Sequence, residues 1–441
     1  MASSVTPPRG MRDYLPADKA KREYALGQIR DVYTRYGFDE IETPVVEDYG
    51  RLHGGLGGDN EKLTFNVLKR GLSADDLRAA ADSGDTSAIA DLGLRFDLTV
   101  PLARFYTTHR GELPPVFRAI QIAPVWRAER PQKGRYRQFV QCDIDIFGEP
   151  GPLAEVELIS ATAAALRELG ITGFTFRLND RRILTGMLDA FGFDPAEHPG
   201  VLITIDKLDK IGVSGVIAEL RDRAVTASAI NELEAYLARI ETAERNGFGV
   251  EQIRALLPEG VDEHVIAELA SIGEAVAHSS AVAGAGGAEG SSAAPLVQFD
   301  PFLVRGMGYY TGPIFEIHHP ELGYSLGGGG RYDGVVGRFL GQDVPASGAS
   351  LGFDRIVDLI DTDAVTREDA LVLVHEKGAD PAALVALKTQ LVARGTRVRL
   401  EKRVKNLKGL LDRVTAAGFT RFALVPADAT GIEDLEIKPL G

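Results

Sequence analysis

The sequence predicts an α+β main body, in which helices flank an antiparallel sheet, followed by a small C-terminal α/β domain. The sheet is expected from residues 116–147, where an apolar run and an alternating run flank one charged loop, the pattern of strand, loop and strand. After residue 370, short apolar runs alternate with helical patterns, which is typical of a mainly parallel sheet. A chain of 441 residues is also too long for one hydrophobic core.

Three parts of the chain follow from these patterns. Residues 1–200 and 296–360 form the main domain, and residues 370–441 form the C-terminal domain. Residues 201–295 are rich in Ala, Glu and Leu and read as a helical insertion, whose Gly- and Ala-rich end (281–295) is expected to be a flexible linker. A second linker is expected at 361–369.

The elements of the main domain are predicted from periodicity and from turn residues. We expect helices at 18–36, 73–91 (an inserted helical loop) and 152–170, with strands at 39–46, 92–99 and on both sides of the 116–147 hairpin. Strand signals resume at Leu296 and continue through 302–304 and 314–318, and the segment 349–355 leads into a helix that ends near Ile360. In the C-terminal domain we expect strands at 371–374, 398–400 and 422–425, with helices at 381–394 and 404–417.

Composition is that of a soluble globular chain, with 44% hydrophobic and 25% charged residues. No apolar run reaches the ~20 residues that a membrane span requires, and the N-terminus lacks an apolar signal core, so we expect no membrane association and a cytoplasmic location. Cys142 is the only cysteine, which excludes an intramolecular disulfide framework and a cysteine-based zinc site.

The net charge of -14 argues against wholesale coating of nucleic acid, but the charge is uneven. Residues 371–441 hold 12 Lys and Arg against 8 Asp and Glu, a balance of +4, which leaves -18 on the rest of the chain. A basic C-terminal unit on an acidic body suggests one domain that meets a polyanion, although a difference of this size also arises by chance.

The hairpin loop, residues 126–139, is the most informative segment, because it holds five cations and one carboxylate. Guanidinium groups match phosphate oxygens in geometry and in charge, so this composition favours a site for a polyphosphate. The alternative is a solvated basic hairpin. The ordered pair Arg127 and Glu129, with Phe139 close behind to stack on a base, favours the phosphate site.

Several separated segments resemble the class II aminoacyl-tRNA synthetases, and the histidyl-tRNA synthetase family in particular. Residues 37–44 resemble motif 1 of the class, the Arg127 hairpin resembles motif 2, and residues 350–355 resemble motif 3. Residues 303–312 and 329–334 resemble the two histidine signatures of the family, and residues 9–16 resemble its entry segment. The resemblance runs from residue 8 to about 440. It implies a class II catalytic domain and an α/β anticodon-binding domain.

The resemblance further implies the reaction of a histidine–tRNA ligase: activation of L-histidine with ATP to histidyl-adenylate, then transfer to the 3′ end of tRNA(His). Negative charge builds on phosphate oxygens in the first step, so fixed cations supply much of the catalysis. Arg127 and Arg305 are the implied catalytic residues at the α-phosphate, the latter where other class II enzymes rely more on a metal. ATP would further meet Arg355 at the γ-phosphate, Glu129 at the adenine and Phe139 at the base. Mg²⁺ is expected with ATP, held mainly by phosphates and water.

Recognition of histidine requires partners for an imidazole and an ammonium group. Gln141 and Asp145 stand four residues apart on one predicted strand, so their side chains share a face. By resemblance, Asp97-Leu98-Thr99 would bind the amino group. The rest of the implied histidine site is Arg127, Arg305, Tyr309, Tyr310 and Tyr332. Plainer roles exist for some of these: Asp97 as a helix cap, Tyr332 as a core residue, and Arg355 as one partner of a surface ion pair.

Other positions are candidates for contact with the tRNA or with a second subunit. Arg130 and Gln132 are candidates for the acceptor end of the tRNA, since forked donors suit phosphates and guanine edges. A basic stretch at 402–408 is a candidate for the anticodon stem, and a solvated helix end is nearly as good an explanation. A homodimer is implied because motif 1 builds the subunit interface of class II enzymes.

Two further features have alternative interpretations. The run Gly327–Gly330 is read either as a flexible turn or as backbone that approaches a ligand or adopts positive φ; it is not a P-loop, because no Gly-Lys-Ser/Thr follows. Gly308 stands where the family usually has Asp. The alternatives to the enzyme are a paralogue acting as regulatory subunit of an ATP phosphoribosyltransferase and a tRNA-binding module without chemistry. The presence of Arg127, Arg305 and Arg355 and of the basic C-terminal domain argues against the paralogue, and the intact motif 2 loop argues against the module.

Overall fold

The computed structural model describes residues 5–54, 63–132, 134–223, 225–241, 247–284, 296–305, 308–360, 369–426 and 428–440. Two compact units share the chain: Leu26–Ile360 with the segment up to Arg12, and Asp13–Ala25 with the chain from Asp361 onward. Helix α1 (Pro16–Arg35) spans the division at Leu26. Most of both predicted linkers (285–295 and 361–368) lies outside the described residues.

The main unit is built on one large sheet, in which the described residues form eight strands. Their order is β1 (Asp39–Glu40), β5 (Phe117–Trp126), β6 (Gln138–Phe147), β11 (Ala346–Gly352), β10 (Gly327–Arg331), β9 (Pro313–His318), β7 (Thr175–Asp180) and β8 (Val297–Phe299). The two outermost pairs, β1–β5 and β7–β8, are parallel, and the central pairs are antiparallel. The predicted α+β class, with an antiparallel sheet and flanking helices, is confirmed.

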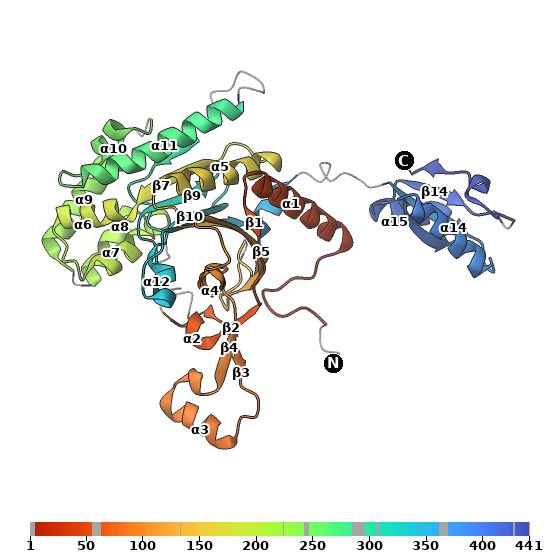
Figure 1. The fold of residues 1–441 in the computed structure, drawn as a ribbon, viewed down its shortest axis with the longest axis horizontal. Helices are drawn as coiled ribbons and strands as arrows, with labels where there is room; N and C mark the ends of the chain where they lie inside the picture. The colour runs from red at the N-terminus through yellow and green to blue at the C-terminus, as the bar shows by residue number, and fades with distance from the viewer. Residues whose placement is uncertain are drawn as a thin grey trace. The chain divides into compact units, whose positions relative to one another are not determined.

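Helices cover both faces of this sheet (Figure 1). On one face α5 (Leu153–Glu168) packs against β11 and β6, with α11 (Glu263–Gly284) beside it. On the other face α4 (Thr99–His109) and α12 (Gly334–Leu340) pack together over a core that contains Phe147 and Tyr332. Because alternate residues of a strand share a face, Gln141 and Asp145 point to the same side as Phe147, toward α4.

Smaller elements surround the sheet. An arm contains the short sheet β2 (Val46–Asp48), β4 (Ala90–Leu94) and β3 (Asn66–Leu68), with α2 (Tyr49–Leu52), α3 (Ala74–Ser83) and the 3-10 turn η2 (Thr86–Ala88). The helical region contains α6 (Arg181–Phe191), α7 (His198–Ile205), α8 (Leu208–Asp222), α9 (Ala227–Glu241) and α10 (Val250–Leu256) in addition to α11. After β11 the chain forms α13 (Phe353–Ile356) and the 3-10 turn η3 (Val357–Leu359).

The C-terminal part of the second unit has the predicted alternation of strands and helices. Its sheet order is β13 (Arg397–Lys402), β12 (Ala370–His375), β14 (Arg421–Leu424) and β15 (Lys438–Pro439). The β12–β13 and β12–β14 pairs are parallel, and β15 is antiparallel. Helices α14 (Pro381–Ala393) and α15 (Leu407–Ala416) bury apolar residues in two clusters that both include residues of β12, and a 3-10 turn, η5 (Ile432–Asp434), precedes β15. Within the described residues, no helix combines the length and apolarity needed to cross a bilayer.

Several local predictions were wrong. The expected strand 39–46 is two strands in different sheets, β1 and β2, because the chain leaves the large sheet before Pro44. Strand character in 92–99 ends at Leu94, and Thr99 begins α4, which was not predicted. Residues 302–304 are not a strand, and residues 281–284, placed in the linker, belong to α11.

The glycine run is neither a turn nor a loop, since Gly327–Arg331 form the central strand β10. A Cβ on Gly329 would lie 1.9 Å from the carbonyl oxygen of Gly348 on β11 and 2.8 Å from the ring of Phe315 on β9. The run therefore allows close approach by neighbouring strands and side chains. Positive φ, the other part of the prediction, does occur, at Gly328 and Gly330.

Candidate active site

A row of polar residues crosses the sheet on the face toward α4. Its centre is β6, where Gln141, Asp143 and Asp145 alternate and are all buried. In register with Asp143 lie Gln121 of β5 and Ser350 of β11, followed by Gly328 of β10 and Glu316 of β9. Buried polar groups are costly unless they are paired, so a polar row of this kind marks a functional surface more often than a packing surface.

The segment Asp97–Thr99 lies at one end of this row. Gln121 holds it there, because its Nε2 donates to the Leu98 carbonyl at 3.3 Å while its Oε1 accepts from Thr43 Oγ1 at 3.0 Å. Asp97 Oδ1 accepts a hydrogen bond from the Val100 amide at 3.2 Å at the start of α4. One of the two carboxylate oxygens therefore caps the helix, as the plainer interpretation of Asp97 predicted. The Leu98 side chain is fully buried, and only its backbone faces polar partners.

Three buried carboxylates, Asp97, Asp143 and Asp145, act on one another electrostatically. Burial raises the pKa of Asp145 to about 7, and a hydrogen bond from the Tyr332 hydroxyl opposes part of that rise. Burial and the charge of Asp145 raise the pKa of Asp143 well above its ordinary range. Burial disfavours the ionised form of such carboxyl groups, and a cationic ligand favours it.

Three tyrosines enclose the carboxylates. The rings of Tyr309 and Tyr310 are 4.9 Å apart, and that of Tyr309 is 5.9 Å from Tyr332. Side-chain hydrogen bonds join Tyr309 to Thr99 and Tyr310 to Arg305, and burial raises the pKa of both phenols. The structure thus brings the two predicted tyrosines of residues 303–312 together with Tyr332 of the second signature.

Two glycines make the room that this arrangement needs. A Cβ on Gly348 would lie 2.0 Å from Asp145 Oδ1, and a Cβ on Gly328 would lie 2.7 Å from Arg305 Nη1. Arg305 has φ +56°, the one positive value at a non-glycine among the described residues. Such a conformation costs of order 1–3 kcal/mol and clusters at functional sites, which is consistent with a cation held in place for a ligand.

The predicted catalytic cations border the polar row. Arg127 donates from Nε to the Phe96 carbonyl at 2.9 Å, and its guanidinium lies 5.1 Å from the centre of the Phe139 ring. Arg305 donates from Nη1 to Glu316 Oε2 at 3.0 Å. Backbone and carboxylate acceptors therefore hold both guanidinium groups in defined positions.

The remaining candidates lie toward the tip of the β5–β6 hairpin. Glu129 pairs with Arg135 at 3.1 Å, while Arg130 and Gln132 are both exposed. Arg355 of α13 donates from Nε to the Gly134 carbonyl at 3.3 Å and from Nη1 to the Ser325 carbonyl at 2.6 Å. Within the described part of the chain, Arg355 therefore bonds to backbone carbonyls and not to the carboxylate that the surface ion pair would require.

Asp143, Ser350 and Glu316 were missed by sequence reasoning. Gln141 Nε2 donates to Ser350 Oγ at 3.1 Å and to Asp143 Oδ2 at 3.2 Å. The alternation that joined Gln141 to Asp145 also puts Asp143 on the same face, so that signal was available. Nothing local in the sequence indicates that Ser350 or Glu316 reaches this place.

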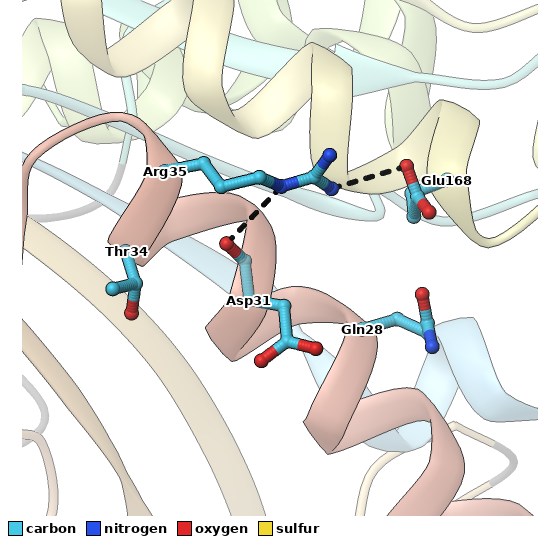
Figure 2. Close-up of a pocket in the computed structure, with 5 residues that line it drawn as sticks. All are labelled: Gln28, Asp31, Thr34, Arg35 and Glu168. Carbon is cyan, nitrogen blue, oxygen red and sulfur yellow. Dashed lines mark hydrogen bonds and ion pairs between the residues drawn. The ribbon is translucent and has the colours of Figure 1, made fainter.

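A separate surface hollow lies between α1 and the C-terminal end of α5 (Figure 2). It is lined by Gln28, Asp31, Thr34, Arg35 and Glu168, and none of the predicted site residues is among them. Arg35 spans it, with Nη2 3.3 Å from Glu168 Oε2. Both side chains of this pair are largely exposed, so the hollow is a solvated groove between two helices.

Comparisons with known proteins show the family of the chain. The sequence profile described as "Histidyl-tRNA synthetase" matches residues 10–356. A protein of Leifsonia xyli subsp. xyli named "Histidine--tRNA ligase" is 59% identical over 444 residues, which covers 100% of this chain and 99% of that protein. The chain belongs to the histidyl-tRNA synthetase family. The resemblance deduced from the sequence is thereby confirmed.

More distant members of the family also align over most of their length. A "Probable histidine--tRNA ligase" of Tropheryma whipplei (strain Twist) is 40% identical over 95% of each chain. The crystal structure of histidyl-tRNA synthetase from Nostoc sp. PCC 7120 matches with a TM-score of 0.74 and 24% identity, covering 99% of this chain and 95% of that one. At that identity the structural match supports the fold alone.

Proposed function

We propose that this synthetase activates L-histidine with ATP to histidyl-adenylate and transfers the histidyl group to the 3′ end of tRNA(His). The observation that supports this most directly is the buried acid cluster beside two fixed guanidinium groups. Such a site suits a cationic amino acid at one end and a phosphate at the other.

In the first step the carboxylate of the amino acid attacks the α-phosphate of ATP, and pyrophosphate leaves. Arg127 and Arg305 bracket the polar row, so both would donate to the α-phosphate oxygens as their charge increases. Each is already oriented by an acceptor, Phe96 O or Glu316 Oε2, so little reorganisation is needed when the substrates bind.

Histidine would lie along the face of β6. Asp145, held by Tyr332, would accept from the imidazole, and Tyr309 and Tyr310 would enclose the ring. Asp97, Thr99 and Gln141 would meet the ammonium group. These three residues belong to α4, its leading turn and β6, so the ammonium site depends on packing between the helix and the sheet.

ATP would extend toward the hairpin tip. Phe139 would stack on the adenine, Glu129 would accept from its amino group, and Arg355 would hold the γ-phosphate. Glu129 would then exchange Arg135 for the nucleotide, which is feasible because exposed ion pairs contribute only about 0–1 kcal/mol. Mg²⁺ would bind mainly through the ATP phosphates and water, so it needs only one or two protein carboxylates.

The tRNA would meet two parts of the chain. Arg130 and Gln132 extend from the hairpin tip, where the acceptor end would reach the adenylate. The α/β domain after residue 370 would bind the anticodon stem with its basic residues, and residues 201–295 would form an insertion domain. We further propose a homodimer, as in class II enzymes, and a cytoplasmic location, where tRNA and ATP are available.

A regulatory role without catalysis is the second candidate. A crystal structure of an "ATP phosphoribosyltransferase regulatory subunit/histidyl-tRNA synthetase" from Bacillus halodurans C has a similar fold, with a TM-score of 0.71, 21% identity and coverage of 94% of this chain and 97% of that one. That match supports a shared fold. No observation on the described residues favours the regulatory role, so it serves as an outcome of the test.

ATP–pyrophosphate exchange with each of the twenty amino acids tests the proposal. Exchange with histidine alone is expected, followed by charging of tRNA(His) in a second assay. Arg305→Ala should lose exchange in a folded protein, whereas Arg78→Ala, an exposed cation on α3, is the matched control. Absence of exchange with every amino acid in folded protein would support the regulatory alternative instead.

A further inference from the structure

The side-chain amide of Gln141 is held by two neighbours, Ser350 and Asp143. Its Nε2 donates to Ser350 Oγ at 3.1 Å and to Asp143 Oδ2 at 3.2 Å. An amide nitrogen has two N–H groups, so both are used. Ser350 and Asp143 face each other across the β11–β6 register and are hydrogen-bonded to each other, so the three side chains form a closed network.

The other end of the same amide has no hydrogen-bond partner among the residues that the structure describes. Gln141 is 8% exposed, and its Oε1 is buried without a hydrogen bond. A buried carbonyl oxygen that stays unpaired is costly, and native structures keep few of them. This oxygen belongs to a residue on the polar face of β6, next to Asp143 on the same face, where an N–H donor of a bound amino acid would complete its hydrogen bonding.

We propose that Asp143 and Ser350 are positioning residues of the amino-acid pocket: they take both N–H groups of Gln141 and so present its Oε1 to an N–H donor of bound histidine. This inference rests on the proposed function, and it explains why the Gln141 amide presents its oxygen, not its nitrogen, to the bound amino acid. A glutamine amide can rotate by 180° and present a donor instead, which would repel an ammonium group. Ionised Asp143 opposes this, because both of its oxygens can only accept and a rotated amide would place its carbonyl oxygen against them.

Asp143 can affect histidine binding in two ways, by orienting the Gln141 amide and, when ionised, by placing negative charge near the site. The variants must separate these two effects. Ser350→Ala removes one orienting partner without changing charge. Asp143→Asn removes the charge but keeps an acceptor for Gln141, whereas Asp143→Ala removes both. Cys142→Ala, on the same strand but facing away from the polar row, controls for damage to β6.

Steady-state exchange, with KM for histidine separated from kcat and from KM for ATP, is the measurement. Asp143→Ala should raise KM for histidine by about 30-fold, the loss expected for one hydrogen bond to a charged group, with kcat and KM for ATP changed less than about threefold. Ser350→Ala should raise it about fivefold, and Asp143→Asn should recover most of the loss. The Cys142→Ala control should bind histidine as the parent does.

A double-mutant cycle completes the test. In a Gln141→Leu background, Asp143→Ala should add no more than about a twofold change, because the group that it orients is gone. If Asp143→Asn is as impaired as Asp143→Ala, or if the two losses multiply in the Gln141→Leu background, charge explains the effect and the positioning role is overturned. If the parent enzyme itself shows no exchange with histidine, the proposed function fails first and the positioning role fails with it.

Discussion

The pocket on β6 and the tip of the β5–β6 hairpin belong to the same two strands, yet they are built in opposite ways. Asp145 and Gln141 are buried and held by neighbours, whereas Glu129 and Arg135 at the tip pair in partial contact with water. Buried networks are rigid because each broken contact is costly, and exposed ion pairs exchange partners with little loss. The comparison suggests a preformed amino-acid pocket beside a nucleotide and tRNA surface that adjusts on binding.

The largest expected effect comes from Arg305, the cation beside β9 and β10 at the edge of the pocket. Arg305→Ala should lower kcat for pyrophosphate exchange by about 10²–10³-fold, as for removal of one preorganised donor to a developing charge. Quantification of exchange, with circular dichroism to check folding, measures this. Arg305→Lys keeps the charge but not the fork, so an intermediate loss is expected. A kcat within threefold of the parent for Arg305→Ala would remove this residue from catalysis.

Inside the pocket, Asp145→Asn should raise KM for histidine by roughly 10–100-fold, because a neutral amide replaces the acceptor for a charged group. The pKa of the Asp145 carboxyl is about 7, so the parent should bind histidine more tightly as pH rises through that value. The KM of the variant should lack this part of the pH dependence. Titration of KM in parallel for the two proteins cancels the substrate's own ionisation. Parallel profiles would show that Asp145 is not the titrating partner.

The same carboxyl links pH to stability. Its pKa is about 7 in the folded chain and 3.8 ordinarily, so the folded state binds more protons between these values and stability falls as pH rises through that window. Asn does not titrate. The unfolding free energy of Asp145→Asn relative to the parent should therefore increase from pH 5 to pH 8, with an upper bound of about 1.4 kcal/mol for each pH unit of the window that is crossed. Denaturant titrations at both pH values measure it; a constant difference contradicts the assignment.

At the hairpin tip, smaller and more selective effects are expected. Arg130→Ala should leave exchange within twofold, but raise KM for tRNA about 5–10-fold and reduce the salt dependence of tRNA binding by about one unit of slope, as for loss of a phosphate contact. Aminoacylation at several salt concentrations, with exchange as the internal control, tests this. Equal losses in both assays would place Arg130 in the adenylation step.

The smallest effect is expected at Gly308, the position where resemblance to the family predicts Asp. The residue is exposed, and an added Cβ would meet no atom within 4 Å. Gly308→Asp should therefore change unfolding free energy by less than about 0.5 kcal/mol and KM for histidine by less than threefold. A gain of tenfold or more in kcat/KM would show that the missing carboxylate limits this enzyme.

Local patterns sufficed for much of the fold. The hairpin 116–147, helix α5 and the alternating elements after residue 370 were predicted within a few residues of their observed bounds, because periodicity and turn residues act over short stretches. Failures occurred where partners are distant. The stretch 39–46 was split because β1 pairs with β5 while β2 pairs with β4, and no local signal distinguishes one partner from the other.

For the site, the amino-acid sequence specifies which chemical groups are present and which of them share a face, as for Gln141 and Asp145 on one strand. Their partners depend on the assembled sheet. Ser350 reaches Gln141 across 209 positions of chain, and Gly328 leaves space for Arg305, because antiparallel register aligns β6, β11, β10 and β9. Register depends on the pairing of all the strands in the folded sheet, so no single segment of the sequence predicts which residues lie opposite each other.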